Sequence, residues 1–156
     1  MKMEIERKFL VTGDGWRAIA GAGQLCEQGY ISSGENEVTV RVRQIGEKGY
    51  LTLKGMAKGI SRPEVEYEIP VDEAKFMLQN FCGDRIVSKT RYLAEIEGLI
   101  WEIDEFSGLN QGLIVAEIEL KTETTKFSKP GWLGKDVSLD WHYTNASLAE
   151  KPYLKW

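Results

Sequence analysis

The sequence predicts one antiparallel β domain, a closed or nearly closed sheet with a few helices packed on its outside. About eight segments alternate apolar with polar side chains, as strands with one buried face do. Short turns that contain glycine join most of these segments, which favours hairpins between neighbouring strands. The 156 residues include no repeat, low-complexity stretch or linker, and this length is typical of a single domain with its own core.

The first half of the chain holds five of these strand candidates and one short helical candidate. The strand 37–45 is the clearest, because it is rich in β-branched residues and alternates strictly. Gly21 and Gly23 end the helical candidate. In order, we expect a strand at 3–11, a turn at 12–15, a helix over 16–22, strands at 25–32 and 37–45 around a turn at 33–36, a hairpin connection at 46–49, a strand at 50–54, a loop at 55–60 and a strand at 61–69.

The second half begins with a helix and continues with three more strands. Pro70 ends the preceding strand, and Asp72 is the expected N-cap of a helix that runs to about Phe81 and stops at Gly83. The remaining expected elements are strands at 85–95, 99–106 and 114–121, a hairpin turn at Gly98, a connection at 107–112, a loop or short helix at 129–135 and a short helix at 147–151.

The composition argues against several classes of protein. The formal net charge is −4, whereas non-specific nucleic-acid binding needs a basic surface, so we expect no nucleic-acid partner. The charged start MKMEIERKFL lacks the apolar run of a signal peptide, and no segment is long enough to span a membrane. Cys26 and Cys82 lack CxxC spacing and are predicted to be free buried thiols. We therefore expect a cytoplasmic protein with no membrane partner, and the sequence makes no prediction of its oligomeric state.

Charged side chains occupy alternate positions in most of the strand candidates, and their sign is sorted by strand. Like charges two residues apart repel each other, and a face that only meets water gains nothing from that arrangement. The opposite faces are apolar enough to form a core outside the sheet, which the helices at 16–22 and 72–81 can cover. We therefore expect the charged faces to point into the sheet's centre: Arg41, Arg43, Lys54, Lys89 and Arg91 are basic, and Glu64, Glu66, Asp104, Glu117 and Glu119 are acidic.

A lumen with these charges suits a polyanion that carries a divalent metal ion. Buried charges must be paired or liganded. Arginine and lysine bind phosphoryl oxygens, and arginine can do so with two parallel hydrogen bonds. Carboxylates on neighbouring strands bind hard cations such as Mg²⁺ or Mn²⁺. The first strand would present both kinds of group, because Glu4, Glu6 and Lys8 share one face.

An ordered set of motifs over nearly the whole chain resembles the CYTH domain, the family of triphosphate tunnel metalloenzymes. The first motif, Glu4-Ile5-Glu6-Arg7-Lys8-Phe9, looks like the family's N-terminal ExExK. The others follow in the family's order: Arg41-Val42-Arg43, Thr52-Leu53-Lys54, Arg62-Pro63-Glu64-Val65-Glu66, Lys89-Thr90-Arg91-Tyr92, Glu102-Ile103-Asp104, Ala116-Glu117-Ile118-Glu119 and a tail that ends in Tyr143-Thr144-Asn145-Ala146-Ser147.

The resemblance implies an eight-stranded antiparallel barrel that forms a closed tunnel around a triphosphate-bearing small molecule. It implies a metal site, with two Mg²⁺ or Mn²⁺ ions, made by Glu4, Glu6, Asp104, Glu117 and Glu119. It implies phosphate binding by Lys8, Arg41, Arg43, Lys54, Arg62, Lys89 and Arg91, with Glu64 and Glu66 facing the same tunnel. Short bacterial members resemble inorganic triphosphatases. In that reaction Glu4, Glu6, Glu117 and Glu119 would hold the attacking water and Lys8 would steady the transferred phosphoryl group.

Other functions fit parts of the same pattern. An adenylate cyclase of the fourth class, or a thiamine or nucleoside triphosphatase, would use the same fold and add a pocket for an organic group. Trp16, Tyr30 and Trp141 could stack on a base, although core or rim positions are favoured for each. A non-catalytic polyphosphate binder would have little use for the carboxylates, and a plain β domain would leave the charged faces in water. His142 stands where relatives often have a basic residue, and we expect it at the surface.

Overall fold

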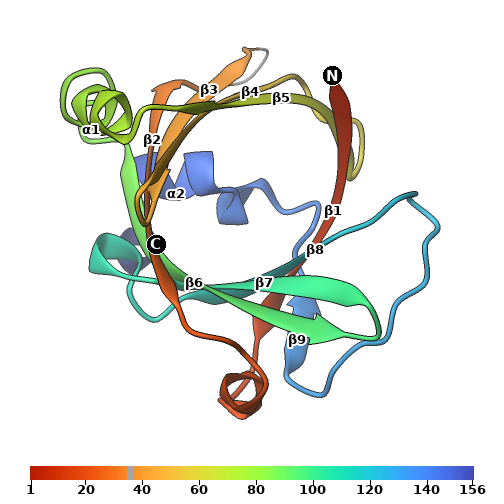
Figure 1. Cartoon of the computed structure of the whole chain (residues 1–156). Coiled ribbons are helices and arrows are strands. Elements are labelled where there is room, and N and C mark those ends of the chain that lie inside the picture. Colours follow the sequence, from red (N-terminus) through yellow and green to blue (C-terminus); the bar gives the residue numbers. More distant parts are fainter. Residues whose placement is uncertain (35–36) are drawn as a thin grey trace.

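The computed structural model describes residues 1–34 and 37–156, and in these residues eight of nine strands close into one antiparallel barrel (Figure 1). The strand order is β5-β4-β3-β2-β6-β7-β8-β1, and β1 pairs back with β5 to complete the ring. The ninth strand, β9, pairs with the C-terminal part of β1, beyond the residues that pair with β5. The strands are β1 (Lys2–Val11), β2 (Gln24–Ser32), β3 (Thr39–Ile45), β4 (Lys48–Lys54), β5 (Ser61–Ile69), β6 (Ile86–Ile96), β7 (Leu99–Phe106), β8 (Ile114–Glu119) and β9 (Leu133–Asp136).

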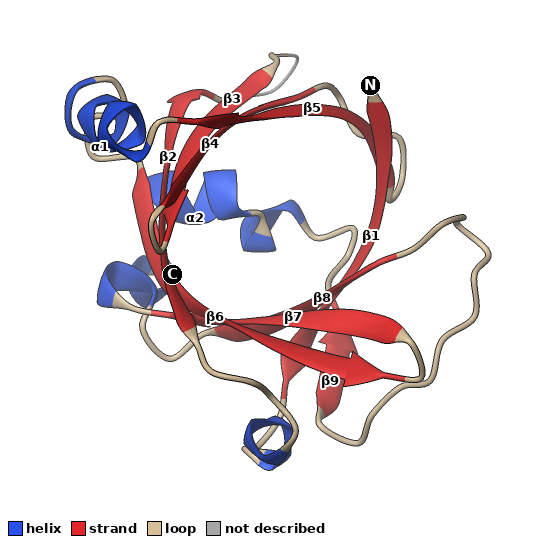
Figure 2. Cartoon of the chain, in the orientation of Figure 1, coloured by secondary structure: helices blue, strands red, loops and turns tan. Residues whose placement is uncertain are grey.

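The two α-helices in the described residues lie in different places, one on the outside of the barrel and one across its end (Figure 2). Helix α1 packs on the outside of the barrel, as predicted, whereas α2 lies across one end of it. None of these helices is both long and apolar enough to cross a membrane. The two α-helices are α1 (Val71–Asn80) and α2 (Asn145–Glu150), and the 3₁₀ turns are η1 (Gly15–Ala18), η2 (Gly108–Asn110), η3 (Trp141–Tyr143) and η4 (Tyr153–Lys155).

The closed barrel and every predicted strand are confirmed, with 61–69 and 99–106 matching at both ends. The predicted turn at 33–36 falls partly on 35–36, which lie outside the described residues. The hairpin between β6 and β7 turns at Glu97 and Gly98, both of which have positive φ. Glycine adopts such φ values without strain.

Three local expectations were wrong, each for a backbone reason. The N-cap of α1 is Pro70, whose extended backbone leads into the helix, so Asp72 lies within the first turn. There its charge still favours the helix N-terminus. The predicted helix at 16–22 is one 3₁₀ turn, and the predicted loop or short helix at 129–135 becomes β9 at its end because Leu133–Asp136 pairs with β1.

The apolar core lies mostly outside the barrel, as the alternation predicts. One cluster joins Trp16 and Trp132 to the outer faces of β1, β7 and β8, where Trp101 and Ile103 are 1% and 0% exposed. Another lies between α1 and the strands β3 and β4. Cys26 and Cys82 are buried free thiols, as predicted, and the cytoplasmic location inferred from the sequence stays a prediction.

Two isoleucines of β7 test where this core lies. Ile103 is completely buried on the outer face, and Ile100 is 53% exposed on the same strand. Ile103→Ala should lower the free energy of unfolding by about 2–5 kcal/mol, because it leaves a cavity in a packed cluster. Ile100→Ala should cost less than about 1 kcal/mol. Urea unfolding of both variants measures the difference; equal losses would mean that this outer face is not packed.

Candidate active site

The barrel encloses a cavity of about 950 Å³ that is lined mainly by charged side chains. Of the fourteen site residues predicted from the sequence, all but Asp104 line it. They reach it from β1, β3, β4, β5, β6 and β8, and the C-terminal segment 137–150 lines it at one end. The structure adds Glu102, which shares the inward face of β7 with Asp104, and Asn145 of α2. The charged faces therefore point inward, which excludes the plain β domain with solvated faces.

Strand pairing brings β1 and β8, which lie more than 100 residues apart in the chain, together in this cavity. In β1 and β8 the paired residues are Glu6 with Glu119 and Lys8 with Glu117. The Nζ of Lys8 lies 3.2 Å from Glu117 Oε1, and both side chains are nearly buried. The ExExK motif and the motif Ala116-Glu117-Ile118-Glu119 thus form one wall of the cavity.

Three carboxyl groups are neighbours on this wall. The carboxyl of Glu6 lies close enough to those of Glu4 and Glu117 for each to affect the pKa of its neighbour. Burial and the nearby negative charges of Glu117 and Glu4 raise the pKa of Glu6 well above its usual value. Burial acts in the same direction on Glu117, but Lys8, Lys89 and Arg91 outweigh it and hold the Glu117 pKa well below its usual value. A proton on Glu6 therefore relieves repulsion inside the cluster.

The charge of Glu4 is balanced by Lys54 of β4. The Nζ of Lys54 donates to both oxygens of Glu4, at 3.0 and 2.8 Å, and lies 3.3 Å from Glu64. Burial raises the pKa of Glu4, but the ammonium of Lys54 more than compensates, so the Glu4 pKa is lowered overall. This pair ties β1 to the β4–β5 hairpin.

Stability should respond to pH through Glu6. Because folding raises the Glu6 pKa, the folded protein binds this proton more tightly than the unfolded chain does. The resulting stabilisation is present below the usual pKa of about 4.3 and is lost as pH rises through the raised value. Glu6→Gln, which stays neutral, should therefore melt higher than the unsubstituted protein at pH 8, with a smaller difference at pH 5. Thermal unfolding at both pH values measures this. Glu105→Gln, on the outer face of β7, should show no gain at pH 8; a Glu6→Gln variant without one would contradict the carboxyl cluster.

The opposite kind of charge is in excess around Arg41 and Arg43 of β3. Both guanidinium groups approach one oxygen of Glu66, at 3.4 and 3.3 Å, and Thr52 donates to the same oxygen at 2.6 Å. The buried Nε atoms of Arg41 and Arg43 have no hydrogen-bond partner among the described residues. Burial and the positive charges of Arg41 and Arg91 lower the pKa of Arg43. Because the two arginines share one carboxylate, part of their charge and hydrogen-bonding capacity is available to an anion.

Asp104 is not with the other carboxylates. It is completely buried, and its oxygens accept from Lys89 at 2.7 Å and from Arg91 Nε and Nη2 at 2.8 Å each. Arg91 also contacts Glu102 at 2.6 Å. Burial disfavours the charge on Asp104, but Lys89 and Arg91 outweigh it and lower its pKa. Asp104 therefore serves Lys89 and Arg91 as a counter-charge, and the metal contact that the resemblance implies for it stays a prediction.

Two further predicted residues lie apart from the centre. Arg62 lines the cavity, but its guanidinium donates at 3.0 and 2.7 Å to the carbonyl of Gly55, so it also braces the β4–β5 loop. Glu119 lies at the rim, where it pairs with Lys2 and its side chain is 44% exposed.

The aromatic candidates lie in the core or at the rim. Trp16 is buried in the outer core, and Tyr30 is 3% exposed with its hydroxyl accepting from Gln28 at 2.7 Å. Trp141 is 56% exposed and lines the cavity mouth. His142 is at the surface, as predicted, and its ring stacks on Trp141 with centroids 3.9 Å apart.

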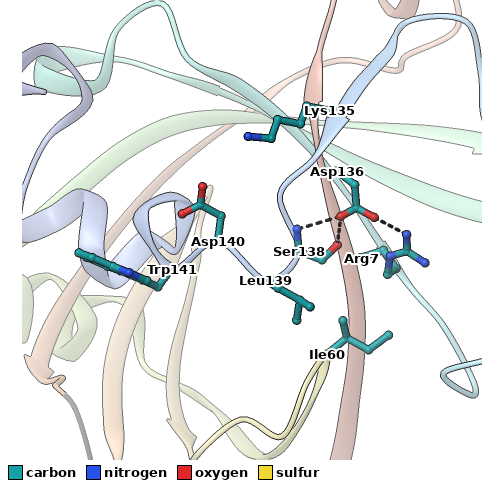
Figure 3. A pocket seen from close by; sticks show the side chains of 8 residues that line it. All are labelled: Arg7, Ile60, Lys135, Asp136, Ser138, Leu139, Asp140 and Trp141. Carbon is teal, nitrogen blue, oxygen red and sulfur yellow. Dashed lines mark hydrogen bonds and ion pairs between the residues drawn. The ribbon is translucent and has the colours of Figure 1, made fainter.

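A second, more open hollow of about 560 Å³ lies beside the barrel wall (Figure 3). Ile60, Ser138, Asp140 and Trp141 line both this hollow and the central cavity. On one wall, the carboxylate of Asp136 accepts from the guanidinium of Arg7 and from Ser138. Its charged residues are two basic and two acidic side chains, without the cluster of arginines that β3 brings to the barrel lumen.

The carboxyl cluster has the donors that a hard divalent cation prefers. Glu4, Glu6 and Glu117 supply only oxygen, which suits Mg²⁺ or Mn²⁺. Among residues 1–34 and 37–156, no three Asp, Glu, His or Cys side chains are grouped as one metal ion requires. The reason is that Glu4 turns toward Lys54 and Glu117 toward Lys8. The donor chemistry fits such a cation, and the lysines hold two of the donors in ion pairs.

The CYTH domain model matches residues 2–153 of this sequence. The chain belongs to the CYTH domain family. An inorganic triphosphatase of Acetivibrio thermocellus is 48% identical over 153 residues, which cover 98% of this chain and 97% of the relative. An inorganic triphosphatase of Nitrosomonas europaea is 37% identical, with 94% and 96% covered. The crystal structure of an inorganic triphosphatase superposes with a TM-score of 0.67 at 32% identity and covers 96% of this chain and 95% of that one.

Proposed function

We propose that this CYTH protein hydrolyses triphosphates inside the barrel, with inorganic triphosphate as its substrate. The two relatives at 48% and 37% identity are both named inorganic triphosphatase, and each is covered over nearly its full length. The observation that carries the proposal is the sorted lumen. Arg41 and Arg43 share one carboxylate and keep buried N–H groups that bond to no described residue, in the same cavity as the carboxyl cluster.

The basic side chains would bind and orient the substrate. Arginine and lysine form charge-assisted hydrogen bonds with phosphoryl oxygens, which are about twice as strong as neutral ones. Glu66 occupies the guanidinium groups of Arg41 and Arg43 at long distances of 3.4 and 3.3 Å. A triphosphate oxygen would take the free Nε–H groups, and the bound chain would then lie along the basic wall toward Lys8 and the carboxyl cluster.

The carboxylates would hold the divalent cation and the attacking water. We assign the cation, Mg²⁺ or Mn²⁺, to Glu4, Glu6 and Glu117, with Glu119 as a further donor at the rim and a second ion sharing the same set. When bound, it would supply neutralisation of the phosphoryl charge and a lowered pKa of bound water. Lys8, held 3.2 Å from Glu117, would donate to the terminal phosphoryl group. Its pKa is raised because Glu117 and Glu6 outweigh its burial, so it keeps its charge.

A substrate comparison tests the proposal. Purified protein is given tripolyphosphate, ATP or thiamine triphosphate, each with Mg²⁺, with Mn²⁺ or with EDTA. We expect phosphate release from tripolyphosphate that needs the cation and exceeds release from the two organic substrates. Cyclic AMP from ATP without cleavage of tripolyphosphate would favour the cyclase. Faster cleavage of thiamine triphosphate or ATP would reassign the substrate, and tight binding without turnover would favour a polyphosphate binder.

A further inference from the structure

Among the residues that the structure describes, Lys89 of β6 has two hydrogen-bond acceptors, which leaves one N–H of its ammonium group without a partner. Its side chain is 1% exposed, and its Nζ donates to Asp104 Oδ2 at 2.7 Å and to Asn145 Oδ1 at 3.0 Å. The Nζ also lies 5.5 Å from the centroid of the Phe106 ring. An ammonium group has three donors. Because Lys89 lines the cavity, the third donor is available to a ligand there.

Asp104 alone does not fix the direction of this ammonium group. Both oxygens of Asp104 also accept from Arg91, at 2.8 Å each, so the carboxylate is shared between two cations. Lysine has a flexible stem and three rotatable donors. A second acceptor is needed to hold Nζ in one orientation, and Asn145 provides it.

Asn145 is itself held by the C-terminal segment. It is the first residue of α2, and the hydroxyl of Thr144 caps this helix by accepting from the N–H of Ser147 at 3.2 Å. Leu148 of the same helix is completely buried against the apolar cluster at that end of the barrel. Since a lysine ammonium can only donate, the amide oxygen of Asn145 must face it.

We propose that Asn145 is a positioning residue, which fixes the Lys89 ammonium so that its third N–H meets the bound triphosphate. The proposal rests on the proposed function, because it assigns Lys89 to the phosphate-binding wall. It also assigns α2 a role beyond closing one end of the barrel. The helix and its cap place the amide oxygen of Asn145 against Lys89, 56 residues earlier in the chain.

Two substitutions at Asn145 separate orientation from charge. Asn145→Ala removes the acceptor, and we expect kcat to fall about 10- to 100-fold because the reacting groups lose alignment. KM should change less than about threefold, since the other basic residues still bind the chain by charge-assisted contacts. Asn145→Asp keeps an acceptor in place, so kcat should stay within about threefold while KM rises roughly tenfold through repulsion of the anion.

A double-mutant cycle tests whether Asn145 acts through Lys89. With Lys89→Met already present, Asn145→Ala should cause no further loss of kcat. The matched control is Lys151→Ala, an exposed position just after α2, which should leave kcat and KM unchanged. An equal loss from Asn145→Ala in both backgrounds would overturn the proposal. Alanine and aspartate are both tolerated in the first turn of a helix, and melting temperatures verify that the variants fold.

A second readout does not depend on turnover. The ¹⁵Nζ resonance of Lys89, assigned by its loss in Lys89→Met, should show faster proton exchange in Asn145→Ala, while Lys151→Ala should not change it. If the unsubstituted protein cleaves no triphosphate, the proposed function fails, and unchanged exchange would separately refute the contact. If the protein is active and Asn145→Ala alters neither kcat nor exchange, the positioning role alone is wrong.

Discussion

Replacing Glu117 with glutamine should abolish cation-dependent release of phosphate from tripolyphosphate while the barrel stays folded. Glu117 is the buried carboxylate of the cluster that pairs with Lys8, at 3.2 Å, and its charge raises the pKa of the neighbouring Glu6. Glutamine keeps the volume and one oxygen but loses the charge that a divalent cation needs. Cation catalysis contributes several kcal/mol of transition-state stabilisation, which corresponds to roughly a 1,000-fold loss of kcat.

The control for this variant is a carboxylate of the same β-barrel that points the other way. Glu105 of β7 lies on the outer face and pairs with Arg17. Glu105→Gln should keep full activity, because an exposed ion pair contributes little. Phosphate release is measured across a Mg²⁺ and Mn²⁺ titration, with circular dichroism as the test of folding. A Glu117→Gln variant that keeps more than about a tenth of the rate would show that the cation, if any, binds elsewhere.

Glu117→Gln also has a consequence for Lys8. The unsubstituted Lys8 is 8% exposed and depends on Glu117 as its main counter-charge. Its other protein acceptor in the described residues is the carbonyl of Tyr143, at 3.0 Å. Removal of one partner from a buried pair usually destabilises by about 3–5 kcal/mol. A loss smaller than this would indicate that Glu6 takes up the charge of Glu117 by releasing its proton.

The alternation of charge along the strands was enough to predict the face of each site residue. It could not predict depth along the barrel axis, because depth depends on the stagger of neighbouring strands. Asp104 and Glu119 show the difference. Both point inward by alternation, yet Asp104 is completely buried between Lys89 and Arg91, and Glu119 is at the rim beside Lys2. An alternating pattern shows which face a side chain is on, but it carries no information on depth along the barrel axis.

The contacts made by the C-terminal segment could not be predicted from sequence patterns, for another reason. The short helix near 147–151 was predicted, but its place across the barrel end follows from tertiary packing of Leu148 and Ala149 against strands far away in the chain. Asn145 carries no local signal of its own, since asparagine at the start of a short helix is ordinary. Glu102, in contrast, could have been included from its position two residues before Asp104 on the same face.

Arg43→Gln should weaken triphosphate binding strongly and leave the ligand-free protein at least as stable as before. Arg43 is almost buried, shares Glu66 with Arg41 and lies 5.4 Å from the ring of Tyr50. Burial and the charges of Arg41 and Arg91 lower its pKa, so its positive charge is less favourable in the folded protein than in water. Two hydrogen bonds from a charged group are worth about 3 kcal/mol or more, and their loss should raise KM about 100-fold.

The two effects are measured together by melting with and without tripolyphosphate. Without ligand, Arg43→Gln should melt at the same temperature as the unsubstituted protein or up to about 4 °C higher, which corresponds to roughly 1 kcal/mol in a chain of this size. With ligand, the unsubstituted protein should gain far more, because stabilisation by a ligand grows with its affinity. Arg17→Gln on the outer face is the control and should change neither the KM nor the gain with ligand.

The change in melting temperature of Arg43→Gln without ligand distinguishes a role of Arg43 in stability from a role in ligand binding. If Glu66 were present to neutralise the arginines, removing Arg43 would break a needed pair and lower the melting temperature. If the arginines are present for an anion, Glu66 is only a partial substitute for it. One oxygen of Glu66 accepts from Arg41, Arg43 and Thr52, the last at 2.6 Å. Without Arg43, this oxygen has one donor fewer to share and can bond better with Arg41. A stable Arg43→Gln variant that no longer binds tripolyphosphate would therefore identify the basic cluster around Arg41 and Arg43 as the binding site itself.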